Sequence, residues 1–182
     1  NLTPDNIINA AEAQQDLTLD GTSNAEPGQT VTVMLGDKQY QARVQNDGTW
    51  QLTVPAADVG ALADGTLTVT ASVSDVAGNS SSTDRVGLVD ATVPQVTIDD
   101  FVTSSNTVNH TAHSQAQILS GSVTGAAAGD RVTVTINDVE YTTVVDASGH
   151  WSLGLPASVV QGLADGTWNV DVSVTDRSGN TG

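Results

Sequence analysis

The sequence predicts an all-β protein made of two tandem antiparallel β-sandwich domains. The first observation is a repeat, because Trp50 and Asp64 recur 101 positions later as Trp151 and Asp165. A period of about 100 residues suits a small domain with its own core. The second observation is that apolar and polar residues alternate between turn signals, which is the pattern of half-buried strands. Each repeat is therefore predicted to be a separate domain of short strands.

The strands are predicted from alternation with period two, which places every second side chain on one face of a sheet. Four apolar faces of this kind are Val31, Val33 and Leu35; Val132, Val134 and Ile136; Leu67, Val69, Ala71 and Val73; and Trp168, Val170, Val172 and Val174. About seven such strands in each repeat, separated by turn pairs such as Asn137-Asp138, favour a two-sheet sandwich of immunoglobulin type.

One stretch in each repeat is helix-like. It reads PAADVGALADG from Pro55 to Gly65 and PASVVQGLADG from Pro156 to Gly166. A proline opens it and a glycine closes it, so we predict a short crossover between the two sheets with one turn of 3₁₀ helix.

The aromatic residues favour packing over ligand stacking. Trp50 and Trp151 each enter a strand directly after a tight turn and share a face with a leucine two residues on. We predict that both indoles fill the core. Tyr40 and Tyr141 are predicted to be strand residues whose hydroxyl groups lie at the rim of the domain.

The repeat boundaries predict a first domain at 1–90, a linker at 91–95 and a second domain at 96–182. Repeat 1 has no counterpart of Val96–Asp100, and repeat 2 has none of Ser81–Asp90. We therefore expect the first domain to lack its opening strand and the second to lack its closing strand. An unpaired sheet edge invites strand donation, so strand exchange between chains is one expectation.

Composition restricts the function. There is no cysteine, so disulfides and thiolate metal sites are excluded. The chain has 21 acidic and 5 basic residues, for a formal net charge of −16, which disfavours nucleic acid and anionic membranes as partners. No apolar run approaches the roughly 18 residues that span a membrane. All but three acids are aspartates, which suit turns and equally suit calcium.

Catalytic motifs are weak. His110, His113 and His150 occur only in repeat 2, and a solvated loop is a simpler interpretation than a transition-metal site. No G-x-S-x-G turn is present. We predict that the chain is not an enzyme.

Gly-x-Trp, a proline, Leu-Ala-Asp-Gly-Thr and Asp-x-x-Gly-Asn follow one another in both repeats. This combination resembles the bacterial immunoglobulin-like (Ig-like) repeats of giant biofilm adhesins of the Bap-like and RTX type, which type I systems secrete. The resemblance implies extracellular extender domains on the bacterial cell surface, serving cell adhesion and biofilm formation. Calcium often stiffens such a rod at its domain junctions.

The partners implied are neighbouring Ig-like repeats of the same chain, with host or bacterial surface ligands held by other domains. The segment itself would not insert into a membrane. The alternative is an adhesin module whose loops recognise a carbohydrate or a protein receptor.

The calcium hypothesis names oxygen ligands from several segments, as calcium requires. At the complete junction the candidates are Asp64, Asp90, Asp99, Asp100, Asp176 and Asn180. Neighbouring junctions would use Asp75, Asn79 and Asp165. Calcium there would lock two domains into one orientation. The other interpretation is that these aspartates stabilise only their own turns.

Overall fold

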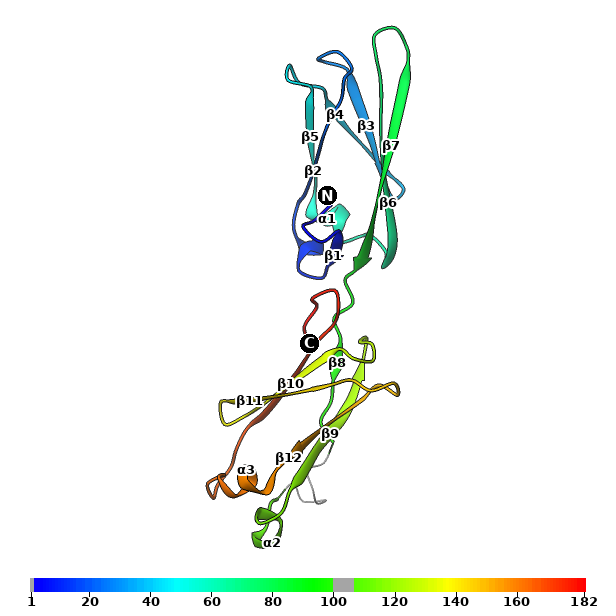
Figure 1. The fold of residues 1–182 in the computed structure, drawn as a ribbon. Helices are drawn as coiled ribbons and strands as arrows, with labels where there is room; N and C mark the ends of the chain where they lie inside the picture. The colour runs from blue at the N-terminus through cyan, green and yellow to red at the C-terminus, as the bar shows by residue number, and fades with distance from the viewer. Residues whose placement is uncertain (1, 100–106) are drawn as a thin grey trace. The chain divides into compact units, whose positions relative to one another are not determined.

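The computed structural model describes residues 2–99 and 107–182 (Figure 1). Its internal contacts divide the chain into two compact units, unit 1 from Asn1 to Thr92 and unit 2 from Val93 to Gly182. No helix in the described ranges is both long enough and apolar enough to span a membrane.

Unit 1 is a β-sandwich of two sheets. Within its described residues, one sheet has the order β1-β7-β6-β3-β4 and the other pairs β2 with β5. Neighbouring strands are antiparallel except β1 and β7, which are parallel. The strands are β1 (Ile7–Asn9), β2 (Leu17–Thr22), β3 (Thr30–Leu35), β4 (Lys38–Arg43), β5 (Thr49–Val54), β6 (Gly65–Ser74) and β7 (Ser80–Asp90), with the 3₁₀ turn η1 (Glu12–Gln14) and the helix α1 (Ala56–Val59) between them.

Unit 2 repeats this plan. Within its described residues, the sheets have the orders β11-β10-β13 and β12-β9-β8, all antiparallel. Its elements are β8 (Gln95–Val96), α2 (His110–His113), β9 (Gln117–Thr124), β10 (Arg131–Ile136), β11 (Val139–Val144), β12 (His150–Leu155), α3 (Ala157–Gln161) and β13 (Val170–Thr175). The predicted all-β class with tandem sandwich domains is confirmed.

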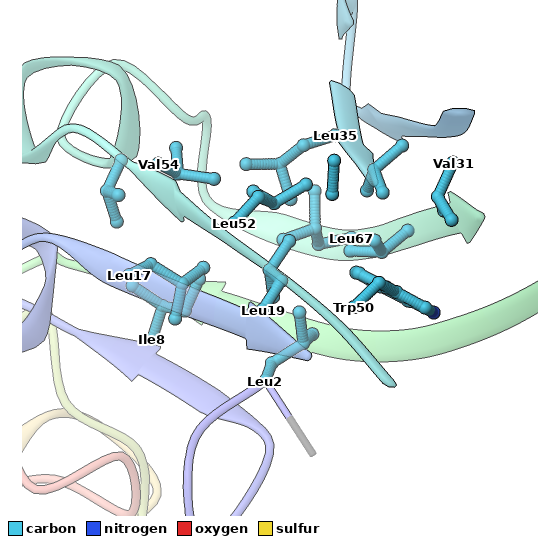
Figure 2. Close-up of a cluster of buried hydrophobic side chains, with 14 of the residues drawn as sticks. Leu2, Ile8, Leu17, Leu19, Val31, Leu35, Trp50, Leu52, Val54 and Leu67 are labelled. Carbon is cyan, nitrogen blue, oxygen red and sulfur yellow. The ribbon is translucent and has the colours of Figure 1, made fainter. Parts of the chain in front are cut away.

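Each unit has its own core between its two sheets. In unit 1 the alternating residues of β3 are at most 2% exposed and pack with leucines from β2, β5 and β6 (Figure 2). In unit 2 the corresponding residues of β10 are equally buried. Trp50 is 9% exposed and Trp151 is 1% exposed. The two tryptophans lie opposite Gly21 and Gly121 in their sheets, so their predicted equivalent core positions are confirmed.

The crossover prediction was correct in place and wrong in helix type. The helix α1 joins β5 of one sheet to β6 of the other. The Pro55 carbonyl accepts the Val59 N–H at 3.1 Å, which closes an i to i+4 turn, so the turn is α-helical rather than 3₁₀. Pro55 has extended backbone before the turn, and Gly60 ends it, with its N–H donating to the Ala56 carbonyl.

The last strand of unit 2 is shorter than the alternation predicted. β6 runs for ten residues between β3 and β7, whereas its counterpart β13 runs for six. In the described part of unit 2, β13 pairs with β10 and meets Thr181 at its end. Trp168 therefore precedes the strand and is only half-buried. A strand needs partners on its edges, and alternation alone does not supply them.

Candidate functional site

Asp64 ties the loop after α1 to the segment that leaves unit 1. Its Oδ1 accepts the Ala91 N–H at 2.9 Å, and its Oδ2 accepts the Thr92 hydroxyl at 2.5 Å. The bond from Thr92, followed by the bond from Ala91, lowers the pKa of the Asp64 carboxyl. Because Gly65 pairs with Val89, Asp64 lies across from Asp90 at the same end of the unit. Two of the predicted ligands are thus brought together within unit 1.

The Asp-x-x-Gly-Asn motif forms the same hairpin turn in both units. Asp75 accepts the Asn79 N–H at 2.8 Å on Oδ1 and the Asn79 side-chain amide at 2.7 Å on Oδ2. Asp176 does the same with Asn180, at 2.8 and 2.9 Å. The bonds from Asn79 lower the pKa of the Asp75 carboxyl. Both carboxylates therefore stabilise their own turns, whatever else they bind.

The hairpin of unit 2 lies beside the segment by which the chain enters that unit. After the turn, Gly182 exchanges two backbone hydrogen bonds with Val174, at 2.9 and 3.0 Å. Gly182 also packs against Pro94 so closely that an added Cβ would lie 1.7 Å from the Pro94 carbonyl oxygen. β8 contacts β13 as well. Within unit 2, the entry segment and the Asp176 hairpin thus share one end of the sandwich.

An ion pair that the sequence did not reveal anchors this hairpin. Arg177 Nε lies 3.2 Å from Asp130 Oδ1, and an Arg177 terminal N–H donates to the Ala128 carbonyl at 2.8 Å. The Asp130 side chain is 3% exposed and also accepts the Ala127 N–H at 2.7 Å. The only available signal was an arginine in the Asp-x-x-Gly-Asn motif of repeat 2 where repeat 1 has a valine.

Asp99 and Asp165 lie together elsewhere in unit 2. Asp99 accepts the Ser120 hydroxyl on Oδ2 at 2.9 Å, and its N–H donates to the Ser120 carbonyl at 2.8 Å. Gln95 is opposite Thr124, so Asp99 lies about 13 Å further along β9. Asp99, Asp165 and Trp168 line one cavity of about 520 Å³. The predicted ligand Asp100 is outside the described residues.

The chemistry of the predicted ligands fits calcium, because carboxylate, amide and hydroxyl oxygens are the ligands it takes. Asp64 with Thr92 in unit 1 and Asp176 with Asn180 in unit 2 are oxygen-bearing pairs of this kind. Across residues 2–99 and 107–182, no three acidic or histidine side chains gather closely enough to hold a metal ion. The carboxylates accept local hydrogen bonds instead.

Comparisons with known proteins agree with the fold. The family model of the bacterial Ig-like domain matches residues 2–99 and again residues 92–182. One solved structure is that of a Ca²⁺-stabilised adhesin that helps an Antarctic bacterium reach out and bind ice. It is 32% identical, with a TM-score of 0.55, and the match covers 99% of this chain and 44% of that one.

A second solved structure comes from a 1.5-MDa bacterial ice-binding adhesin and is 30% identical, with a TM-score of 0.54, covering 99% of this chain and 58% of that one. The chain therefore spans about half the length of these relatives. The comparison with curated proteins finds no match.

Proposed function

The chain belongs to the bacterial Ig-like domain family, of which it carries two consecutive copies, and on that premise we propose that it is an extender segment of a large adhesin on a bacterial cell surface. The observation that carries the proposal is the match over 99% of the chain to two adhesins at 30% identity or more. In this role the units hold other domains at a distance from the cell, for adhesion and biofilm formation.

The contacts of Ser148, His150 and His113 support a structural role rather than an enzymatic one. The Ser148 hydroxyl lies 3.1 Å from His150 Nδ1 in the same turn. His113 Nε2 lies 3.3 Å from the Leu163 carbonyl oxygen. These contacts are local to unit 2. An acidic surface with a net charge of −16 also keeps a long extracellular chain soluble.

We further propose that calcium stiffens the junction between the units. In unit 1 the ligands would be Asp64 and Asp90, and in unit 2 they would be Asp176 and Asn180. Calcium supplies positive charge that offsets carboxylate repulsion and accepts about six to eight oxygens from different segments. The chain contributes Asp64 already placed beside residues 91 and 92, and a hairpin already placed beside Pro94.

The other predicted ligands belong to different places in the proposal. Asp75 and Asn79 would serve a neighbouring junction as the counterpart of the Asp176 hairpin, and Asp165 would do so as the counterpart of Asp64. Asp99 lines the same cavity as Asp165, which favours a place with Asp165. Asp100 stays a proposal of the sequence.

Calorimetric titration with calcium tests this proposal. We expect a dissociation constant on the order of 10⁻⁴–10⁻³ M, the range of extracellular modules. Asp64→Ala and Asp90→Ala should weaken binding at least tenfold. The matched control is Asp171→Ala, which removes an exposed carboxylate from β13 away from the junction. Equal effects of all three variants, or no heat of binding, would refute a junction site.

A second candidate function is supported by the cavity beside Trp168. Asp99, Asp165 and the half-buried indole give unit 2 an aromatic and acidic lining that unit 1 lacks, since Leu67 replaces the tryptophan there. Aromatic faces with carboxylates suit a carbohydrate. Glycan-array binding that Trp168→Leu abolishes would favour this ligand-binding module over a spacer.

A further inference from the structure

The chain contains a tripeptide pattern that enzymes use to attach sugars. The pattern is Asn-x-Ser/Thr, in which x is not proline, and the sugar is bound by the asparagine side chain. It occurs three times, beginning at Asn1, Asn79 and Asn109. Asn1 lies outside the described residues. Because so short a pattern also arises by chance, the surroundings of the other two asparagines decide which of them is an acceptor.

The side chain of Asn79 is engaged within its own turn. Its Nδ2 donates to Asp75 Oδ2 at 2.7 Å, and its backbone N–H donates to Asp75 Oδ1 at 2.8 Å. Ser81, the third residue of the tripeptide, pairs with Val73 in the β6–β7 hairpin. A sugar on Asn79 would compete with the charge-assisted bond to Asp75, and the tripeptide would have to leave its ladder to enter a transferase. In the folded chain, Asn79 is therefore a poor acceptor.

Asn109 has the opposite arrangement. Its side-chain oxygen accepts the Thr111 N–H at 3.1 Å and the Ala112 N–H at 2.9 Å. Because N–H groups donate only to the amide oxygen, the remaining amide atom is Nδ2. In the part of the chain that the structure describes, neither Nδ2 nor the Thr111 hydroxyl has a hydrogen-bond partner. Asn109, His110 and Thr111 are all exposed. The two groups that define the tripeptide are thus available on the surface of unit 2.

Unit 1 has the same side-chain arrangement without the tripeptide. Asn9 is the counterpart of Asn109, and its Oδ1 accepts the Ala11 and Glu12 N–H groups, both at 3.0 Å. Asn9 lies in β1, which is paired with β7, so the arrangement is kept where a neighbouring strand is present. The residue two positions after Asn9 is Ala11, which has no hydroxyl. The two units thus share the geometry of this asparagine and differ in the hydroxyl beside it.

We propose that Asn109 is an acceptor for an N-linked sugar, which a glycosyltransferase transfers from a sugar activated as a diphosphate ester. A bond forms between Asn109 Nδ2 and C1 of the sugar while the bond from C1 to the diphosphate oxygen breaks. The diphosphate leaves with the electron pair of that bond, and Nδ2 gives up one proton to a base of the transferase. The bonds to Asn109 Oδ1 use only the amide oxygen, so the product retains them.

The sugar would lie at the end of unit 2 that carries α2 and α3. These two helices contact each other, and Figure 1 shows them away from the hairpin that follows β13. The proposed calcium ligands Asp176 and Asn180 belong to that hairpin. The modification therefore leaves them accessible. It adds to the spacer role a bulky and solubilising group on the surface of the unit.

Peptide mapping by mass spectrometry, on the chain isolated from the cells that produce it, tests this proposal. We expect the peptide that contains Asn109 to be heavier by at least one sugar residue, and the peptide that contains Asn79 to have its unmodified mass. An Asn109 peptide found only at its unmodified mass would overturn the proposal. Equal modification of both asparagines would overturn the selection of Asn109 by the fold.

Three variants test the role of the hydroxyl, with circular dichroism as the check on folding. Thr111→Ala removes the hydroxyl but keeps the backbone N–H that Asn109 accepts, so modification should be lost while the fold remains. Thr111→Ser keeps a hydroxyl and should remain modified. Ala11→Thr completes the tripeptide in unit 1 and should make Asn9 a new acceptor. Modification that survives Thr111→Ala, or that does not appear at Asn9 in Ala11→Thr, would overturn the proposal.

Discussion

The two tryptophans show how one residue type serves two equivalent positions differently. Both fill the core opposite a glycine, but Trp151 is almost fully enclosed and its indole N–H bonds to Thr97. Trp50 borders a groove. Removal of a large enclosed side chain leaves a cavity that the surrounding residues fill only in part.

We expect Trp151→Ala to destabilise unit 2 by about 3–5 kcal/mol, the usual cost of such a cavity. Trp50→Ala should cost less, since its ring is more exposed and forms no hydrogen bond within the described residues. Urea unfolding followed by circular dichroism measures both. Near-native stability of Trp151→Ala would contradict its core assignment.

Asp64 gives a prediction about pH. Its pKa is lowered in the folded chain, so its contribution to stability is present above the unfolded pKa of about 3.9 and is lost as pH falls through the folded value. The free energy of unfolding of Asp64→Ala should therefore differ from that of the unaltered chain at pH 6 and converge with it in strong acid. Urea unfolding of both chains across roughly pH 2–7, the range in which carboxyl groups titrate, measures this difference. A difference that persists unchanged to the acid end would show that the charge of Asp64 is not involved.

Residue roles could be predicted where they depend on nearby sequence. The tryptophans followed a turn and alternated with leucine, so their burial was visible. The contacts of Asp58 could not be predicted, because its partners Lys38 and Tyr40 lie on β4, far from it in the sequence. Burial and the bond to Asp58 raise the pKa of Tyr40 to about 12. Repeat 2 has Val159 instead, so the repeat did not point to this contact.

At the scale of elements, alternation predicted strands well where the strands are paired on both edges. β3 and β10 are central in their sheets, and their apolar faces are buried as expected. β13 ended early because strand length depends on pairing as well as on pattern. The same holds for the predicted calcium ligands. The sequence indicated that Asp64 lies near the exit segment. It did not indicate that Asp99 lies by Asp165, because that placement depends on the register of β8 with β9.

The ion pair of unit 2 gives a prediction about its hairpin. Arg177→Val introduces the residue of unit 1 and leaves the buried Asp130 carboxylate without its cation. Because Arg177 is largely exposed, we expect a modest loss of about 1–3 kcal/mol in unit 2. Thermal unfolding measures it.

The matched control combines Asp130→Gln with Arg177→Val. Glutamine is the residue that unit 1 has at the position of Asp130. The double variant has no buried charge and should recover much of the lost stability. A double variant as unstable as the sum of both single variants would show that the two residues act independently.

At the scale of the whole molecule, the chain has two units, each with its own core. In the proposed junction, carboxylates without a cation would repel one another, and the segment around Pro94 would flex on either side of the fixed proline. Calcium would oppose that repulsion and draw ligands from both units to one point. We propose that calcium sets the order between the units and leaves each sandwich folded.

Small-angle X-ray scattering with calcium and with EDTA tests this proposal. We predict that calcium lengthens the maximum dimension and reduces interdomain flexibility, that EDTA reverses both effects, and that Asp90→Ala in calcium behaves like the unaltered chain in EDTA while its circular dichroism is unchanged. An unchanged maximum dimension, together with an unchanged melting temperature on adding EDTA, would contradict it.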